Sequence, residues 1–250
     1  MQPILIIPSR LASTRLPHKP LHLIAEKPLI AHVYERARAA FDGRIVVACC
    51  DTRVIALVKS LGGEAVLTDP DLPSGTDRVF AAYKQIAGQN TTNDDIIINL
   101  QGDMAIFPKD LIQHTLAVFK NVPTDIATAV CRIPVADVAD PSTVKVAFEA
   151  SEDSIFGKAL YFSRAAIPYG AKQFFKHIGI YAYTKKSLTD FVASDVGHLE
   201  DIEKLENLRG LSLGQRFGAA IVDGDYFSVD TLHDVKKAEE YLSKKDIYVI

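Results

Sequence analysis

The stretch ILIIPSRLASTRLPHKPL, residues 4–21, decides the fold class of this 250-residue chain. Its first four residues form an apolar run that stops at Pro8, a pattern typical of a short buried strand. The loop that follows, 8–20, carries three basic residues, Arg10, Arg15 and Lys19. We therefore expect the chain to begin with a core strand that opens into a basic loop.

Outward from this stretch, apolar runs alternate with helical patterns through the first half of the chain. Buried strands separated by helices indicate an α/β fold with a mostly parallel, Rossmann-like central sheet that helices flank on both faces. Ligands of such sheets bind beyond the carboxyl ends of the strands, which selects the loops after Ile7 and Leu100. The predicted strands are 4–7, 44–50, 65–67 and 95–100, and the predicted helices are 28–41, 52–61, 76–87 and about 108–119.

The pattern changes near residue 125, where strand patterns follow one another with few helices between them. We expect a mixed extension of the sheet with a smaller subdomain that covers the substrate. Because the sequence shows neither an internal repeat nor a flexible linker, residues 1–250 are predicted to form a single domain. The strands expected here are 126–133, 144–148, 158–162 and 179–183, and the helices are 185–194, 198–209 and 231–243.

Composition limits the class of protein. Hydrophobic residues make up 48% of the chain and charged residues 24%, as in an ordinary globular protein. A net charge of −3 gives no general attraction to nucleic acid or to an anionic membrane. Three cysteines without metal-type spacing argue against a disulfide framework or a zinc site. The N-terminus lacks a basic segment, and its apolar run is short, so we expect a cytoplasmic protein.

The loop 8–20 has the composition of a phosphate-binding loop. Arginine offers planar, often bidentate hydrogen bonds to phosphate, and lysine offers a compact charge. Pro8, Pro17 and Pro20 restrict the backbone and help to preorganise the loop. The loop lacks the glycines and the Gly-Lys-Ser/Thr sequence of a P-loop. A basic loop that is merely solvated remains the alternative.

Two aspartates are candidate ligands of Mg²⁺. Asp103 follows the strand 95–100, and Asp230 precedes the last predicted helix. Magnesium prefers one or two carboxylates, with water and phosphate oxygens at its remaining positions. The alternatives are a turn role for Asp103 and a helix-capping role for Asp230.

The chain resembles the 3-deoxy-manno-octulosonate (Kdo) cytidylyltransferases, also called CMP-Kdo synthetases. The opening motif IIPSRLASTRLPHKPL (6–21) carries the resemblance, and further motifs follow in order over nearly the whole chain. These are SGTDR (74–78), NLQGD (99–103), VKV (144–146), ALYFSRAAIPY (159–169), KHIGIYAY (176–183), EKLENLR (203–209) and VDT (229–231).

The resemblance implies an enzyme, usually a homodimer, that transfers CMP from CTP to the anomeric hydroxyl of Kdo, for lipopolysaccharide biosynthesis. It implies binding of CTP by Pro8, Arg10, Ser13, Lys19, Ser74, Gly75, Arg78 and Gln101, and of Mg²⁺ by Asp103 and Asp230. It implies a sugar site of Arg15, Gln101, Arg164, His177, Tyr181 and Glu206. Arg10, Lys19, Asp103 and Asp230 would carry the catalytic step, and the sequence singles out no general base.

Four departures from the family pattern put the sugar in question. Met104-Ala105 stands where the family usually has Glu-Pro, and Asn207 stands where it has Gln. The segment GAKQFF (170–175) is shorter than usual, and the approach to Asp230 adds Asp223 and Asp225. Neutral drift, a preference for another ulosonic acid such as 8-amino-Kdo, and loss of activity all remain open.

Two other functions compete with this hypothesis. A sugar-1-phosphate nucleotidyltransferase would be expected to have a glycine-rich opening loop, which residues 8–20 lack. A non-catalytic homologue that binds CTP or sugar would have no chemical reason to keep both Asp103 and Asp230 together with Arg10 and Lys19.

Overall fold

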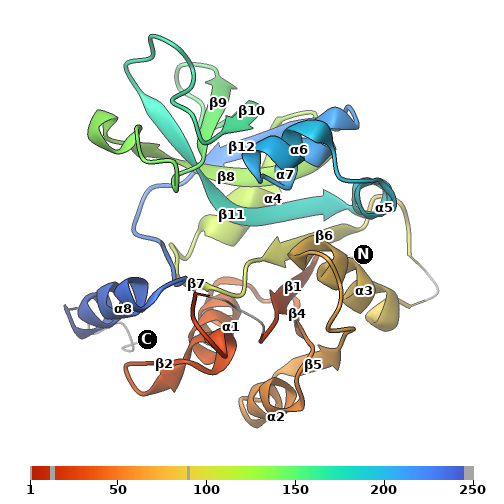
Figure 1. Ribbon diagram of the computed structural model, residues 1–250. Helices are drawn as coiled ribbons and strands as arrows, with labels where there is room; N and C mark the ends of the chain where they lie inside the picture. Colours follow the sequence, from red (N-terminus) through yellow and green to blue (C-terminus); the bar gives the residue numbers. More distant parts are fainter. Residues whose placement is uncertain (1, 12–14, 89–90, 245–250) are drawn as a thin grey trace. The chain divides into compact units, whose positions relative to one another are not determined.

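The computed structural model describes residues 2–11, 15–88 and 91–244, and the chain divides into two compact units (Figure 1). The N-terminal unit comprises Pro3–Gln89, Asn99–Lys109 and Gly224–Ile250. The central unit comprises Met1–Gln2, Asn90–Ile98 and Asp110–Asp223.

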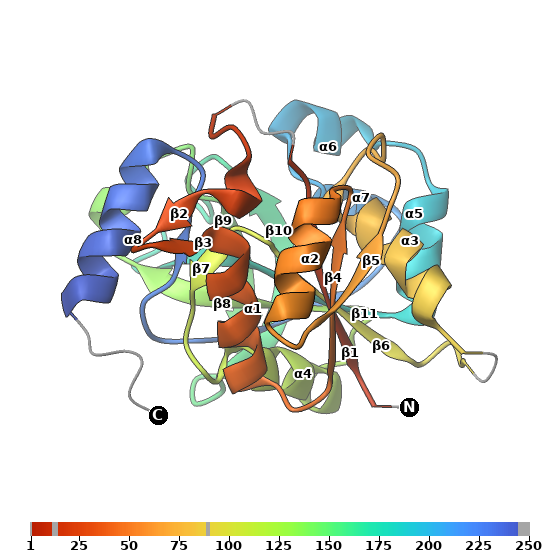
Figure 2. The same ribbon diagram turned by 90° about the horizontal axis from the view of Figure 1, so that it is seen from below.

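The N-terminal unit is built on three parallel strands in the order β5-β4-β1. Leu5, Ile6 and Ile7 of β1 are fully buried, as expected for a core strand. The crossovers β1–α1–β4 and β4–α2–β5 run in the same direction, so right-handed connections place α1 and α2 on one face, where they contact each other. Helix α3 packs across all three strands (Figure 2). The bounds are β1 Ile4–Ser9, α1 Leu29–Ala40, β4 Arg44–Cys49, α2 Thr52–Ser60, β5 Glu64–Leu67 and α3 Gly75–Ile86.

Smaller elements complete this unit around the sheet. β7 (Met104–Ile106) pairs with β13 (Phe227–Ser228), and β2 (Leu23–Ile24) pairs with β3 (Lys27–Pro28). A 3₁₀ helix, η1 (Lys19–Leu21), precedes β2, and α8 (Leu232–Lys244) contacts β2 and β13. Strand β6 (Ile96–Leu100) begins in the central unit and ends in the N-terminal unit.

The central unit contains a mixed sheet in the order β11-β8-β12-β10-β9, and β9 also pairs with β11, so the pairing of these five strands closes on itself. Helix α4 packs against β8, β10, β11 and β12, while α5 packs against β11 and α7 against β10. The bounds are α4 Leu111–Asn121, β8 Ile126–Ile133, η2 Val135–Asp137, β9 Lys145–Ala150, β10 Phe156–Ser163, β11 Phe174–Thr184, α5 Lys185–Ala193, α6 His198–Glu203, α7 Asn207–Ser212 and β12 Phe217–Ile221.

The α/β class is confirmed, and most predicted elements lie within a few residues of their expected bounds. The single helix predicted over 198–209 is wrong: Lys204 adopts a left-handed conformation (φ 53°), which ends α6 before α7 begins. Strands β2, β3, β7, β12 and β13 were not predicted, because most are too short to show a pattern. Within the described residues, no helix combines the length and the apolar character needed to cross a membrane.

Candidate active site

The loops after β1 and β6 meet in the N-terminal unit, as expected from the carboxyl ends of parallel strands. A Cβ atom at Gly102 would lie 2.4 Å from the carbonyl oxygen of Pro8, so only glycine permits this approach. A Cβ atom at Gly75, in the first turn of α3, would lie 3.7 Å from both Gln101 Oε1 and Pro8 Cγ. Three of the predicted nucleotide-site positions, Pro8, Gly75 and Gln101, are thus brought together at one edge of the sheet.

Lys19 joins the two predicted metal ligands. Its Nζ donates to Asp103 Oδ2 and to Asp230 Oδ1, each at 2.7 Å, although 84 and 211 residues separate the partners in sequence. The Lys19 side chain is 14% exposed, which strengthens both interactions relative to a surface ion pair. Arg15 Nη2 lies 3.2 Å from the same Asp230 oxygen, but its side chain is 64% exposed. The structure therefore gathers two carboxylates and two cations from three loops.

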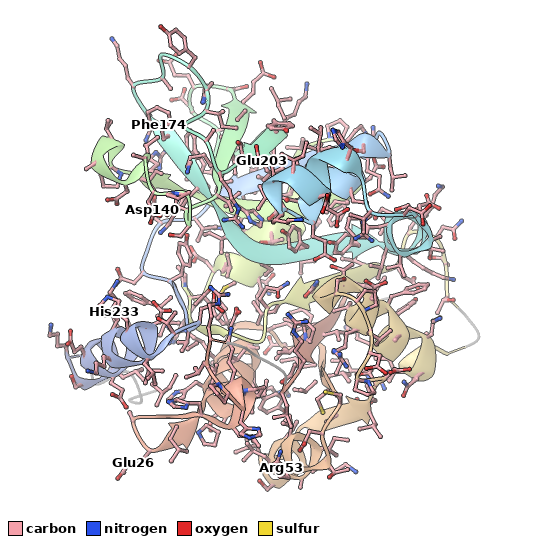
Figure 3. All side chains as sticks on the ribbon, viewed as in Figure 1. Glu26, Arg53, Asp140, Phe174, Glu203 and His233 are labelled. Carbon is pink, nitrogen blue, oxygen red and sulfur yellow. The ribbon has the colours of Figure 1, made fainter. Side chains whose placement is uncertain are left out.

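Asp230 does not cap the last helix. Thr231 and Asp234 form the capping arrangement instead: Asp234 N donates to Thr231 Oγ1, and Asp234 Oδ2 accepts from Thr231 N at 2.9 Å. The backbone N–H of Asp230 also donates to Asp234 Oδ2. His233 marks this first turn of α8 in Figure 3. The Asp230 carboxylate is thereby left to bind cations, and the capping alternative is wrong.

The two carboxylates fit a divalent cation. An ammonium nitrogen already lies between Asp103 and Asp230, so the position accepts positive charge and both oxygens point toward it. No cluster of three or more His, Cys, Asp or Glu side chains occurs among the residues that the structure covers. A metal held by Asp103 and Asp230 would therefore need water or substrate oxygens for its other positions, which is the usual situation of Mg²⁺.

The remaining predicted nucleotide residues have different environments. Ser74 caps α3 by accepting from Asp77 N and donating to Asp77 Oδ2. Arg78 is buried, and its Nη1 donates to Thr68 Oγ1 and to the carbonyl of Asp69. The contacts of Arg78 therefore hold the segment after β5, and its contact with a nucleotide stays a prediction. Arg10 is exposed, and Ser13 lies outside the described residues.

In the central unit, an irregularity in β11 brings two predicted sugar-site residues together. The register against β8 shifts between Ile178 and Tyr181, so β11 contains a bulge there. In a regular strand, residues four apart are about 13 Å from each other. Here the rings of His177 and Tyr181 have centroids 5.1 Å apart. Bulges commonly redirect side chains next to active sites, and this one places both rings in one cluster.

Burial sets the protonation of both rings. It lowers the pKa of His177 to about 3, so the imidazole is neutral at pH 7. Burial, with the nearby Glu206 carboxylate as a smaller cause, raises the pKa of Tyr181 well above its ordinary value. The cluster therefore offers uncharged hydrogen-bonding groups, which suit sugar hydroxyls.

Polar contacts fix Arg164 against the end of α6 and the segment before β9. The Arg164 guanidinium donates to the backbone carbonyls of Glu203 and Pro141 at 2.8 and 2.9 Å, and the backbone N–H of Arg164 donates to the Glu203 carboxylate. The fully buried Lys145 donates to the carbonyls of Asp140 and Thr143, and its burial lowers the pKa of the ammonium group.

Figure 3 labels Glu203, at the end of α6, and Asp140, in the segment before β9. Glu206 directly precedes α7. Lys145 and Arg164 therefore hold the segment 140–143 through its backbone carbonyls. Arg164 also holds the end of α6, which is close in sequence to Glu206.

The departures from the family pattern fall on packing and surface positions. Met104 and Ala105 are 0% and 3% exposed, and Met104 pairs with Ser228 in β13. The N–H of Ala105 donates to the carbonyl of Asp103 at 3.0 Å, a bond that a proline could not make. The Asp223 side chain is 81% exposed and forms an ion pair with Arg132. These contacts favour a change in packing beside Asp103.

Sequence reasoning missed two residues that shape the site. Asp234 could have been found, because Thr231 and Asp234 have the spacing of a capping box. Thr128 could not, since it is one residue among the regular positions of β8. Its Oγ1 lies 2.9 Å from His177 Nε2, and the side chain is fully buried.

Comparisons with known proteins agree with this geometry. The cytidylyltransferase family model matches residues 4–217. The 3-deoxy-manno-octulosonate cytidylyltransferase of Rhodospirillum centenum is 41% identical over 97% of this chain and 94% of its own length. The 8-amino-3,8-dideoxy-manno-octulosonate cytidylyltransferase of Shewanella baltica is 40% identical over 97% and 99%.

Solved structures of nucleotidyltransferases have the same fold as this chain. A CMP:2-keto-3-deoxy-manno-octonic acid synthetase complexed with CTP superposes with a TM-score of 0.87 at 34% identity, over 98% of this chain and 99% of that one. A UDP-glucose pyrophosphorylase has a TM-score of 0.68 at 14% identity, over 98% and 100%, which shows a shared fold.

Proposed function

The chain belongs to the cytidylyltransferase family as a CTP-dependent nucleotidyltransferase, and we propose that it transfers CMP from CTP to the anomeric hydroxyl of an eight-carbon ulosonic acid. The acceptor is Kdo or its 8-amino analogue, and pyrophosphate is released. Curated relatives with these two names are 41% and 40% identical to this chain, so sequence identity does not choose between the two acceptors.

One observation carries the proposal: Asp103 and Asp230 converge on a single cation, the Lys19 ammonium. A protein that merely bound CTP could use basic groups alone. Paired carboxylates beside a basic loop would repel the substrate phosphates unless a metal ion were also bound. Retention of this pair therefore supports catalysis over simple binding.

In the proposed reaction, the sugar hydroxyl attacks the α-phosphorus, and the bond to pyrophosphate breaks on the opposite side. Catalysis of such transfers depends on positioning and on neutralising charge. Lys19 and Arg10 would neutralise the departing pyrophosphate, and Arg15 would add charge beside Asp230. Asp103 and Asp230 would hold Mg²⁺, which would supply charge stabilisation at the phosphates and lower the pKa of the attacking hydroxyl.

The residues of the central unit would hold the acceptor. The neutral His177 ring and Glu206 would bind hydroxyl groups of the sugar. Arg164 would pair with the sugar carboxylate, and to do so its guanidinium would give up one or more of its hydrogen bonds to backbone carbonyls. An 8-amino group would find no cationic imidazole to repel it, because His177 is neutral at pH 7. Both candidate acceptors are therefore chemically acceptable to this cluster.

The test is magnesium-dependent release of pyrophosphate from CTP with Kdo, 8-amino-Kdo and N-acetylneuraminate as acceptors. We expect turnover with an octulosonate and none with N-acetylneuraminate. Asp103→Asn should lower kcat by about 100-fold or more, because it removes a charged metal ligand while keeping the shape. Absence of release with every acceptor, despite measurable CTP binding, would favour a non-catalytic binding protein.

We extend the proposal to the setting of the enzyme. By resemblance to its family, the chain would act as a homodimer in the cytoplasm, and its product would serve lipopolysaccharide biosynthesis. Sedimentation equilibrium of the purified chain tests the dimer, and a monomer at micromolar concentration would contradict it.

A further inference from the structure

Thr128 occupies the point where the bulge of β11 faces β8. It pairs with Tyr181, whereas the neighbouring Ala129 pairs with Ile178, so residues 179 and 180 have no opposite residue in β8. A bulge leaves backbone groups outside the regular ladder, and these need other partners. The fully buried Thr128 hydroxyl supplies one, because its Oγ1 lies 2.7 Å from the carbonyl oxygen of Ile180.

This contact determines the direction of the bond between Thr128 and His177. A threonine hydroxyl has a single proton to donate, and a carbonyl oxygen can only accept. Two oxygen atoms 2.7 Å apart require a proton between them, so Thr128 donates to Ile180. At 2.9 Å from His177 Nε2, the hydroxyl must then act as the acceptor. His177 is therefore protonated on Nε2.

The other ring nitrogen is left as an acceptor. The ring stands between Phe162, at a centroid distance of 5.4 Å and an interplanar angle of 85°, and Tyr181, at 5.1 Å and 40°. These contacts restrict reorientation of the imidazole. Within the part of the chain that the structure describes, Nδ1 has no hydrogen-bond partner. Burial also keeps the ring neutral, since it lowers the pKa to about 3.

We infer that Thr128 is a positioning residue that fixes His177 as the Nε2-protonated tautomer and so presents Nδ1 as a hydrogen-bond acceptor to a donor group of the acidic sugar. The inference about the sugar rests on the proposed function. It deepens that function, because Nδ1 then selects an acceptor substrate with a hydroxyl or ammonium donor at this position. The tautomer itself follows from Thr128, His177 and Ile180 alone.

The first experiment reads the tautomer directly. Two-bond ¹H–¹⁵N correlation spectra of the full chain, labelled with ring-¹⁵N histidine, report which nitrogen carries the proton. His177→Gln identifies the His177 signal among those of the seven histidines. We expect the wild-type spectrum to show the proton on Nε2. A proton on Nδ1 would overturn the inference, whether or not the enzyme accepts any sugar.

The second experiment uses Thr128→Val, which keeps the branched shape and removes the hydroxyl, with Thr128→Ser as the matched control. The valine variant should lose the single Nε2 tautomer and raise the KM for the sugar roughly tenfold, with the KM for CTP unchanged. The serine variant should retain the wild-type tautomer and the wild-type KM.

A purely structural Thr128 would lower the melting temperature of the valine variant and leave its His177 tautomer unchanged, which would contradict the proposal. An unchanged KM of the valine variant for the sugar would also contradict the proposal. If the valine variant does not fold, the wild-type spectrum and the serine variant still decide the tautomer. If the wild-type chain turns over no sugar, the proposed function fails. The ¹H–¹⁵N spectrum still decides whether Thr128 fixes the tautomer of His177.

Discussion

Lys19 places one positive charge between the two carboxylates that are proposed to hold Mg²⁺. Without ligands this arrangement satisfies Asp103 and Asp230, whose mutual repulsion would otherwise be costly. The same ammonium is proposed to bind CTP phosphates, and it cannot do both with full strength. Binding of CTP would thus draw Lys19 away from the carboxylates and leave them to the metal, so nucleotide and metal are expected to bind cooperatively.

Lys19→Met separates these roles. Without CTP, the variant should bind Mn²⁺ about tenfold more tightly than the wild type, because the competing ammonium is gone. It should bind CTP more weakly. Electron paramagnetic resonance of free Mn²⁺ measures the first effect and calorimetry the second. Lys186→Met, which removes an exposed ion pair with Asp190, is the control and should change neither. Weaker Mn²⁺ binding by the Lys19 variant would contradict the competition.

His177 gives the stability of the protein a specific dependence on pH. The pKa of its imidazole is about 3 in the folded chain and near 6.5 when unfolded, so between these values the unfolded chain binds a proton that the folded chain does not. Stability should therefore fall as pH falls from about 6.5 towards 3, by at most about 1.4 kcal/mol per pH unit from this group. This contribution is fully present above pH 6.5.

Urea denaturation of wild type and His177→Gln between pH 4 and 7.5 measures this contribution. Carboxylates that are paired in the folded chain also lose stability in acid, but they do so in both proteins. The free energy of unfolding of the wild type minus that of His177→Gln should decrease as pH falls, because only the wild type loses the contribution of His177. A difference that stays constant with pH would mean that His177 is accessible to protons in the folded chain.

At the level of elements, the sequence allowed prediction of those parts that repeat a pattern. Strand β8 has the predicted bounds, and the buried stripe of α1 contains all four predicted residues, Leu29, Ile30, Val33 and Ala37. The meeting of the loops after β1 and β6 followed from a parallel sheet alone. The bulge of β11 could not be predicted, because it depends on which residues of β8 lie opposite, and a single sequence does not give that register.

The break between α6 and α7 shows the same limit. The sequence 198–209 has a continuous helical pattern, yet Lys204 takes a left-handed conformation. A buried ion pair across the break explains why: Arg209 donates to both Glu200 oxygens at 2.8 and 2.6 Å, and Arg209 also lies 4.8 Å from the Phe191 ring. In one continuous helix, residues nine apart would be separated by about 13.5 Å along the axis, so this pair can form only because the helix is interrupted. Glu206 lies in the connection.

Arg209→Lys should weaken the connection without removing its charge. Lysine cannot form the bidentate contact with Glu200, and the side chains of Glu200 and Arg209 are only about a tenth exposed, at 10% and 9%. We expect a loss of about 1–3 kcal/mol in the free energy of unfolding, and a larger rise in KM for the sugar than for CTP. Arg216→Lys, at an exposed pair with Asp125, is the matched control and should cost less than about 1 kcal/mol. Equal effects of the two changes would contradict a special role for the buried pair.

At the scale of the whole molecule, the candidate residues divide between the two units. Lys19, Asp103 and Asp230 belong to the N-terminal unit, whereas His177 and Glu206 belong to the central unit. The proposed function therefore assigns nucleotide and metal mainly to one unit and the sugar mainly to the other. Arg15 and Gln101, which resemblance assigns to the sugar, belong to the N-terminal unit and should respond to both ligands.

Hydrogen exchange can separate these assignments without any turnover. A non-hydrolysable CTP analogue with Mg²⁺ should slow amide exchange in the described segments 15–20, 74–78, 99–104 and 229–231, because a ligand bound to the folded state suppresses local opening there. Adding Kdo to that complex should extend the slowing to 128–131, 163–165 and 176–181. The segment 52–60, α2, carries none of the candidate residues and serves as an internal control. If the sugar instead protected α2 as strongly as 176–181, its effect would be global stabilisation. The central unit would then lose its assignment as the unit that binds the sugar.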